Sequence, residues 1–282
     1  YIATRLKIVD KPKVHLKQVH TITTPKLGGN AIFIAVTVCV VGVLMTSNLL
    51  TSGEVTYFHY LGLLIGGLIL MLGGYFDDKY DLAPRVSFVA PVLAAFVAIG
   101  FGIEVEKLTN PFGGIVYLSN LQSDFLVFVW LLIVMYTTKF LDGLDGLATS
   151  VSTVGAVMVL LLSLTVAYFQ PDVALLASIV LGAQLGFLFW NFHPASIFLG
   201  EGGSTLVGFL LGTLAVISGG KLATALLVLG IPFMDVVWVV FRRFKNGGLA
   251  EVVKGDRKHL HHRLLSLGLS QRQVVFLYVF VA

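Results

Sequence analysis

The segment that decides the fold runs from Phe58 to Asp81 and reads FHYLGLLIGGLILMLGGYFDDKYD. Its first part, up to Phe76, contains no Asp, Glu, Lys or Arg. A helix of about 20 such residues crosses the hydrocarbon core of a bilayer. The last part places three carboxylates at the point where this span ends. The segment therefore predicts a membrane helix that delivers an acidic cluster to the membrane surface.

The composition of the whole chain agrees with this interpretation. Of 282 residues, 57% are hydrophobic and 12% are charged, whereas a soluble domain carries roughly 25% charged residues. A soluble fold and a disordered chain are both excluded. The single cysteine, Cys39, lies in an apolar run, which excludes an internal disulfide framework. Because the chain starts at Tyr1 and ends at Ala282 within an apolar run, we expect one domain over 1–282 that is truncated at both ends.

Uncharged apolar runs predict an all-α, polytopic transmembrane bundle of about nine spans, eight complete and the last truncated. The predicted spans are Asn30–Leu50, Phe58–Phe76, Val86–Ile103, Phe125–Leu141, Leu147–Phe169, Val173–Trp190, Ser204–Ser218 and Leu222–Phe241, with a ninth beginning near Gln273. Alternating patterns typical of a membrane barrel are absent from the sequence. We expect Pro91 and Pro232 to kink their helices, and the stretch Asn110–Leu118 to form a small hairpin.

The basic residues predict the orientation. If the N-terminus is inside, the segments 1–29, 77–85, 142–146, 191–203 and 242–272 are inner, and together with Lys139 they hold 17 of the 19 Lys and Arg residues. Only Lys107 and Lys221 lie outside. Positively charged loops stay in the cytoplasm, so we predict that these segments face the cytoplasm.

Acidic and histidine residues gather on the same side. The inner carboxylates include Asp77, Asp78, Asp81, Asp142, Asp145, Glu201, Glu251 and Asp256, and six of the seven histidines join them. Carboxylates at the ends of spans are costly and usually functional, so the pattern favours chemistry at the cytoplasmic face. A transporter would place ionisable groups near the midplane of several spans, where Asp235 is the one candidate. We interpret Asp235 as a structural partner within the bundle.

Two acidic segments have the chemistry of a phosphate site. If its helix continues, Asp77 and Asp81 share a face with Asp78 beside them, and such clustered carboxylates repel unless a cation or a shared proton relieves them. Asp142 and Asp145 are each followed by glycine, and oxygen ligands on a flexible turn suit magnesium. The alternatives are charges that cap a helix end in water and an ordinary Asp-Gly turn.

Two further segments are candidates for anion binding. The loop from Asn191 to Ser204 contains Gly200, Glu201, Gly202 and Gly203, and such a loop before a helix can bind phosphate; the alternative is a linker that Ser204 caps. The segment 256–263 reads DRKHLHHR. It could bind zinc, but its basic neighbours oppose a cation and favour anion recognition. The alternative is attachment of a basic loop to the membrane surface.

In their order and spacing, these four segments resemble the polyprenyl-phosphate N-acetylhexosamine-1-phosphate transferases. Those membrane enzymes carry an Asp-Asp-x-x-Asp segment, an Asp-Gly-x-Asp-Gly segment, an Asn-x-x-Pro-Ala…Gly-Asp-x-Gly-Ser segment and a His-x-His-His-Arg loop. Here they appear at Asp77–Asp81, Asp142–Gly146, Asn191–Ser204 and His259–Arg263. The His-x-His-His-Arg form is similar to the branch that uses UDP-N-acetylglucosamine. The chain departs from the family with Glu201 for Asp, Tyr136 and Lys139 for Asn, Pro91 for Gln, and Lys26 for Arg.

The resemblance implies transfer of a sugar 1-phosphate, expected to be N-acetylglucosamine 1-phosphate, from a UDP-sugar to undecaprenyl or another polyprenyl phosphate. UMP is released, and the product starts cell-envelope glycan synthesis at the plasma membrane. It also implies Mg²⁺, with Mn²⁺ as a substitute. Asp77, Asp78 and Asp142 are expected to be catalytic, Asp145 and Glu201 to bind the metal, and Asp81, Lys139, Asn191, Phe198, His259, His261, His262 and Arg263 to bind substrate.

Two alternatives stay open at this stage. One is the same reaction with another UDP-N-acetylhexosamine, because the sequence does not identify the sugar. The other is a membrane transporter, which predicts inverted repeats and midplane charges that are not found in the sequence. We expect membrane lipid but no nucleic acid as a partner, and a homodimer is left open.

Overall fold

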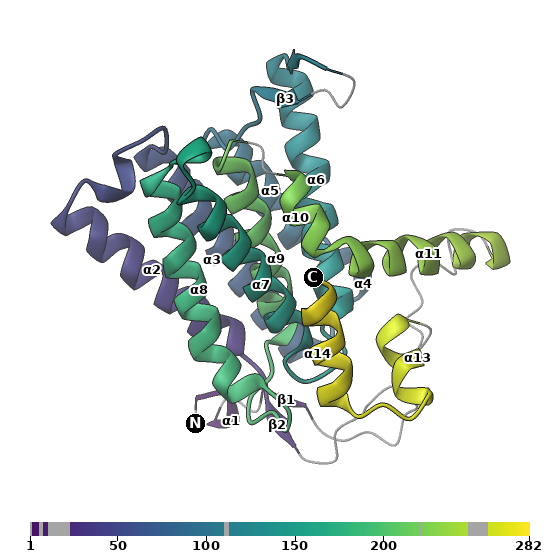
Figure 1. The fold of residues 1–282 in the computed structure, drawn as a ribbon. Coiled ribbons are helices and arrows are strands. Elements are labelled where there is room, and N and C mark those ends of the chain that lie inside the picture. Colours follow the sequence, from purple (N-terminus) through teal and green to yellow (C-terminus); the bar gives the residue numbers. More distant parts are fainter. Residues whose placement is uncertain (1, 6–7, 11–22, 110–112, 220–221, 248–258) are drawn as a thin grey trace.

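The computed structural model describes residues 2–5, 8–10, 23–109, 113–219, 222–247 and 259–282. These residues form a bundle of helices with two short hairpins (Figure 1). The helices are α1 (Ile2–Arg5), α2 (Gly28–Thr46), α3 (Tyr57–Tyr80), α4 (Pro84–Ser87), α5 (Val89–Gly100), α6 (Asn120–Leu141), α7 (Leu147–Ser163), α8 (Pro171–Asn191), α9 (Gly200–Ile217), α10 (Leu222–Val228), α11 (Gly230–Gly247), α13 (Leu260–Ser266) and α14 (Gln271–Val281), with 3₁₀ turns η1 (Leu49–Thr51) and η2 (Val166–Tyr168).

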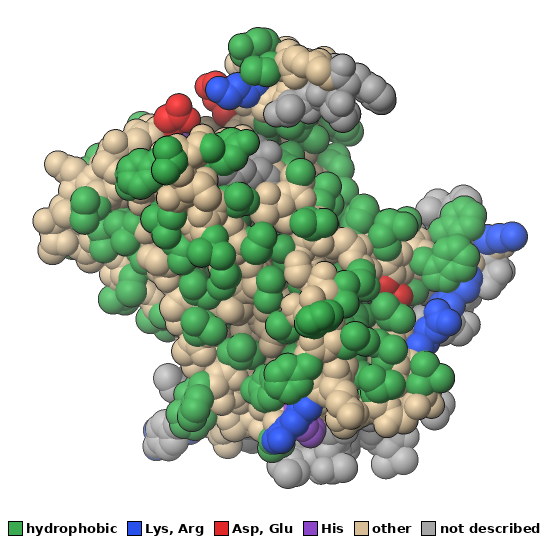
Figure 2. Space-filling model, in the orientation of Figure 1, with side chains coloured by type: hydrophobic (Ala, Val, Ile, Leu, Met, Phe, Trp, Pro, Cys, Tyr) green, Lys and Arg blue, Asp and Glu red, His purple; other side chains and the backbone are tan. Residues whose placement is uncertain are grey.

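The multi-pass, all-α architecture is confirmed. In the described part of the chain, the helices α2, α3, α6, α8 and α9 are long and apolar enough to cross a membrane, and the bent pair α10–α11 is a sixth candidate. Shorter apolar helices cover Pro84–Gly100, Leu147–Ser163 and Gln271–Val281, where the sequence predicts three further spans. Hydrophobic side chains spread over the flanks of the bundle (Figure 2), as contact with lipid requires. The count of nine spans stays a prediction.

Helix α9 lies at the centre of the bundle. It packs against α3, α6, α7 and α2. In an 18-residue stretch of α9, 83% of the residues are buried inside the protein, against 28% in the corresponding stretch of α2. Close approach of its first turn depends on glycine pairs. A Cβ atom on Gly74 of α3 would lie 2.1 Å from the Cα of Gly202, and one on Gly29 of α2 would lie 2.2 Å from the Cα of Gly203. Small residues let backbones meet in this way, so α2 and α3 are fixed against the start of α9.

Both prolines lie just after an interruption of a helix. The predicted span Leu222–Phe241 is broken between α10 and α11, which meet at 73°, and α11 projects away from the bundle (Figure 1). Pro232 lies in the first turn of α11, and Pro91 lies in the first turn of α5. A proline in the first turn of a helix removes no hydrogen bond within that helix, because the N–H groups of the first turn have no intrahelical partner. Pro232 therefore lies next to the 73° bend, where the sequence predicts a kink, and Pro91 lies just after the short break between α4 and α5.

The hairpin predicted at Asn110–Leu118 is present, with antiparallel strands β3 (Lys107–Thr109) and β4 (Ile115–Tyr117). A second antiparallel pair, β1 (Val9–Asp10) and β2 (Thr24–Pro25), was not predicted. It lies at the end of the bundle opposite to β3 (Figure 1). The β1–β2 pair brings the N-terminal segment to the start of α2 and to the cavity described next.

Candidate active site

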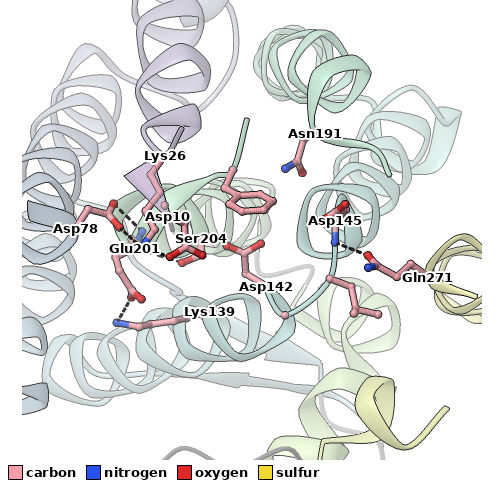
Figure 3. Close-up of a pocket in the computed structure, with 14 residues that line it drawn as sticks. Asp10, Lys26, Asp78, Lys139, Asp142, Asp145, Asn191, Glu201, Ser204 and Gln271 are labelled. Atoms are coloured by element: carbon pink, nitrogen blue, oxygen red, sulfur yellow. Dashed lines mark hydrogen bonds and ion pairs between the residues drawn. The ribbon is translucent and has the colours of Figure 1, made fainter. Parts of the chain in front are cut away.

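A cavity opens at the end of the bundle that carries β1 and β2 (Figure 3). It is lined by Asp10, Lys26, Asp78, Lys139, Asp142, Gly143, Leu144, Asp145, Asn191, Phe198, Gly200, Glu201, Ser204 and Gln271. Seven of these belong to the residues that the sequence predicts as site residues, and they come from α3, α6, α8, α9 and the adjoining loops. Polar groups from distant parts of the chain therefore share one concave surface, as a substrate site requires.

At one end of the cavity, Asp78 is fixed to the start of α9. Its side chain is 2% exposed, and the Glu201 backbone N–H donates to its Oδ2 over 3.0 Å. The Lys26 ammonium lies 3.3 Å from the other oxygen and 4.0 Å from Asp10. An N–H at the start of a helix favours a carboxylate. Asp78, the second aspartate of the Asp77–Asp81 segment, is therefore held in a fixed position at the cavity wall.

Asp77 and Asp81 do not line this cavity. Asp77 lies behind Glu201, in a smaller cavity shared with Ser87 and Lys139, where it accepts hydrogen bonds from the Ser87 hydroxyl and, over 3.2 Å, from the Leu82 backbone N–H. The helix ends at Tyr80, and Asp81 has a left-handed conformation with φ of 52° and an exposed side chain. The expectation that Asp77 and Asp81 share a helical face is wrong, because the helix does not continue through Asp81.

At the other end of the cavity, Asp145 accepts two hydrogen bonds. Its Oδ2 lies 2.7 Å from Nδ1 of His193 and 3.1 Å from the Ala195 backbone N–H. The Gln271 side chain accepts from the Asp145 backbone N–H over 3.4 Å. Figure 3 shows Asp145 beside Asn191 and Gln271, away from Asp78 and Glu201. The two predicted metal ligands, Asp145 and Glu201, therefore face the same cavity from its opposite ends.

Both the oxygen and the nitrogen of the Asn191 side-chain amide form hydrogen bonds within the protein. Its Oδ1 accepts from the Thr149 hydroxyl over 2.9 Å, and its Nδ2 donates to the Ile197 carbonyl over 3.0 Å. Next along the loop, the Phe198 backbone pairs with Pro25 and Gly28. These bonds fix Asn191, the last residue of α8, and Phe198, in the loop between α8 and α9; both are among the residues expected to bind substrate.

Asp142 lies between the two ends of the cavity (Figure 3). It follows the last residue of α6 and is surrounded by other acidic groups. Burial raises the pKa of Asp142 to about 8, and the charges of Glu201 and Asp78 add to the effect. A bound cation would relieve this repulsion.

The donor set of the cavity fits magnesium. Five carboxylates line it, against two lysines, and oxygen ligands suit a hard cation. Within the described ranges, no three His, Cys, Asp or Glu side chains are grouped so as to hold a metal ion by themselves. Magnesium binds through one or two carboxylates and completes its shell with water and substrate phosphates. The arrangement thus suits a metal that arrives with a phosphorylated substrate.

The His-rich segment lies beside the cavity without lining it. His261 is 2% exposed and packs against Gly143, where an added Cβ would lie 2.5 Å from its Nε2. Burial lowers the pKa of His261 to about 3, with the neighbouring histidines adding to the effect, so the ring is neutral at pH 7. His259 stacks on Phe140 and on His261, with ring centroids 5.7 Å apart in each pair.

The other described residues of that segment, Leu260, His262 and Arg263, do not line the cavity either. Arg263 is exposed, and His262 is half-buried. Asp235, interpreted from the sequence as a structural partner, binds His259 and the Leu260 backbone N–H. Glu251 and Asp256 lie outside the described residues.

Sequence reasoning missed Asp10 and Gln271 as cavity residues. Asp10 reaches the cavity through a two-residue strand, which is too short to show a periodic pattern. Gln271 begins α14, and no signal in its neighbourhood distinguishes it from an ordinary residue at the start of a helix. Lys26 belonged to the N-terminal segment that carries the resemblance, but no role was assigned to it.

Comparison with known proteins identifies the family of the chain. Residues 60–219 match the family described as Glycosyl transferase family 4. The chain is 31% identical over 280 residues to a probable undecaprenyl-phosphate N-acetylglucosaminyl 1-phosphate transferase of Bacillus subtilis, covering 97% of this chain and 74% of that protein.

Two other organisms contribute similar proteins. A decaprenyl-phosphate N-acetylglucosaminephosphotransferase of Mycobacterium tuberculosis is 32% identical over 305 residues, covering 98% of this chain and 73% of the relative. An undecaprenyl-phosphate alpha-N-acetylglucosaminyl 1-phosphate transferase of Escherichia coli K12 is 26% identical over 298 residues, covering 100% of this chain and 75% of the relative. The match extends over nearly the whole chain in each case.

Proposed function

The chain belongs to glycosyl transferase family 4, and from this membership we infer that it transfers N-acetylglucosamine 1-phosphate to a polyprenyl phosphate. The observation that carries this conclusion is the near full-length match to relatives named for that reaction in three organisms. The chain is a multi-pass membrane enzyme of the glycosyl-1-phosphate transferase class. A transporter is disfavoured by the same comparisons.

The donor is proposed to be a UDP-sugar, with UMP as the leaving group. Phe198 and Asn191 both line the cavity, and an aromatic ring on a fixed loop suits a nucleobase. Lys26 and Lys139 lie toward the Asp78 end, where cationic groups suit phosphates. On this proposal the reacting phosphates lie at the Asp78 end of the cavity.

Magnesium is the proposed cofactor, with Glu201 and Asp145 as its proposed ligands together with substrate phosphates. Because the two carboxylates face the cavity from opposite ends, one ion bound by both requires them to approach each other. When bound, it would neutralise charge on the diphosphate as UMP leaves. The Asp78 carboxylate lies in the same cavity, and a bound cation would favour the ionised form of Asp142. The chain's own contribution is to hold these oxygens on the fixed first turn of α9 and on the turn after α6.

Asp78 is the proposed residue that orients or deprotonates the lipid phosphate. Of the acidic pair, it faces the cavity while Asp77 lies behind Glu201. The second pKa of a phosphate monoester is about 6, so at neutral pH the acceptor needs positioning more than a strong base. Asp77 is then proposed to support the site through Ser87 and Lys139.

The proposed location is the plasma membrane, with the cavity at the cytoplasmic face. This proposal rests on the 17 inner Lys and Arg residues counted above and on the cavity's position opposite the β3–β4 hairpin. Both substrates are then available, because a soluble nucleotide-sugar comes from the cytoplasm and the polyprenyl phosphate lies in the bilayer.

One assay tests the function directly. Purified protein in detergent is incubated with polyprenyl phosphate, Mg²⁺ and a panel of UDP-sugars, and UMP release is measured. We expect UMP release with UDP-N-acetylglucosamine that depends on the lipid phosphate. Release with another UDP-N-acetylhexosamine alone would reassign the donor, and no release with any of them would overturn the proposed reaction.

A further inference from the structure

An ion pair in the cavity joins two residues at which the chain departs from the family that it resembles. The Lys139 ammonium lies 2.8 Å from Oε2 of Glu201. By the resemblance to that family, Asn is usual at position 139 and Asp at position 201. The two positions lie on different helices, in the last turn of α6 and the first turn of α9. Two departures that are distant in sequence therefore meet in one contact.

The surroundings add further partners to this contact, although the Glu201 side chain is 41% exposed. The Lys139 side chain is 22% exposed, and its ammonium also lies 4.0 Å from Asp77 and 3.3 Å from the Ser87 hydroxyl. Charges that are partly buried are screened less by salt than exposed ones. Without Lys139, the carboxylates of Glu201 and Asp77 would lie in one polar pocket without this cation between them. The longer Glu side chain is the one that reaches the ammonium.

We propose that Lys139 and Glu201 form a matched pair, in which Lys139 positions the Glu201 carboxylate and supplies a fixed positive charge next to the reacting phosphates. Before substrate arrives, the ammonium compensates Glu201 and Asp77. When a divalent cation and a diphosphate bind, the carboxylate turns to the cation and the ammonium to a phosphate oxygen. The identity of those phosphates rests on the proposed function, but the pairing of the two positions does not.

A double-mutant cycle tests the pairing through activity. The variants are Lys139→Asn, Glu201→Asp and the double variant, with Lys79→Asn as a control that removes an exposed lysine outside the cavity. We expect each single variant to lower kcat/KM at least tenfold, and the double variant to be at least fivefold more active than additivity predicts. The control should stay within twofold of the wild type. Additive effects would overturn the pairing.

Binding of Mn²⁺ without substrate gives a second measurement that does not depend on turnover. Free and bound Mn²⁺ are measured by electron paramagnetic resonance on the purified protein. Lys139→Asn removes the competing ammonium, so we expect Mn²⁺ to bind at least fivefold more tightly, whereas Glu201→Gln should weaken binding. Affinity that Lys139→Asn leaves unchanged would overturn the proposal. If the wild type released no UMP from any donor, the proposed function would fail, and this measurement would still decide the pairing.

Discussion

The Nδ1 atom of His259 lies 2.9 Å from Oδ2 of Asp235, while the other carboxylate oxygen of Asp235 accepts from the Leu260 backbone N–H over 2.9 Å. One carboxylate on α11 thus holds a histidine ring and caps the start of α13. The ring of His259 stacks on that of His261, and His261 packs against Gly143, in the turn between Asp142 and Asp145. The projecting helix α11 is linked to the site by this route.

Replacing Asp235 with alanine should loosen α13. Charge-assisted hydrogen bonds contribute roughly 1.5–3 kcal/mol each. We therefore expect backbone amides of residues 260–266 to exchange with deuterium about 10- to 150-fold faster in Asp235→Ala. Hydrogen exchange followed by mass spectrometry measures this, with α9 as an internal control. Unchanged exchange in α13 would show that Asp235 does not hold it.

Removal of the metal should abolish activity. EDTA is expected to stop UMP release, and Mg²⁺ or Mn²⁺, without Zn²⁺, should restore it. Glu201→Gln and Asp145→Asn should each lower turnover at least 100-fold, because a charged ligand is worth several kcal/mol of charge stabilisation. Asp124→Asn, near the opposite end of α6, serves as a matched control. A requirement for Zn²⁺ would instead assign the metal to histidines.

The raised pKa of Asp142 predicts a pH dependence of stability. Burial, with the charges of Glu201 and Asp78, raises this pKa from the ordinary 3.8 to about 8, so the folded protein holds the proton more tightly than the unfolded chain. The contribution to stability is complete below about pH 4 and is lost as the pH rises through about 8. In EDTA, we expect the thermal midpoint to fall between pH 6 and 9.

The variant Asp142→Asn is expected to flatten this pH profile, since its amide does not ionise. Glu104→Gln changes an exposed carboxylate at the other end of the bundle and should leave the profile as in the wild type. A profile that is equally steep in Asp142→Asn would assign the pH dependence to another group.

The distribution of basic residues predicts which reagents reach each end of the protein. After Cys39 is replaced by alanine, a cysteine at Gly247 should react with an impermeant maleimide only from the cytoplasmic side. A cysteine at Gly113, in the β3–β4 hairpin, should react only from the outside. Labelling of both from one side would contradict the proposed orientation and the cytoplasmic location of the cavity.

The sequence predicted the elements better than their contacts. Apolar runs predict α2, α3, α6, α8 and α9, because a helix that crosses the hydrocarbon core must be apolar along its whole length. Asp78, Asp142 and Glu201 could be identified because carboxylates at span ends are rare. The partner of Asp235 could not, because His259 lies 24 positions further along the chain and no pattern in the sequence brings the two together. Likewise, a break after Val228 looks the same as a continuous span when only apolar composition is considered.

The glycine contacts at the start of α9 have a mechanical consequence. Because Gly74 and Gly202 meet at their backbones, and Gly29 and Gly203 do the same, the three helices cannot slide past one another without separating main chains. Bilayers of different thickness tilt and stretch membrane helices, and here such deformation must be absorbed by the outer helices. Reconstitution into lipids of shorter or longer acyl chains should therefore leave the distance between Asp78 and the Glu201 amide unaltered. The geometry of the catalytic end is then independent of the thickness of the membrane.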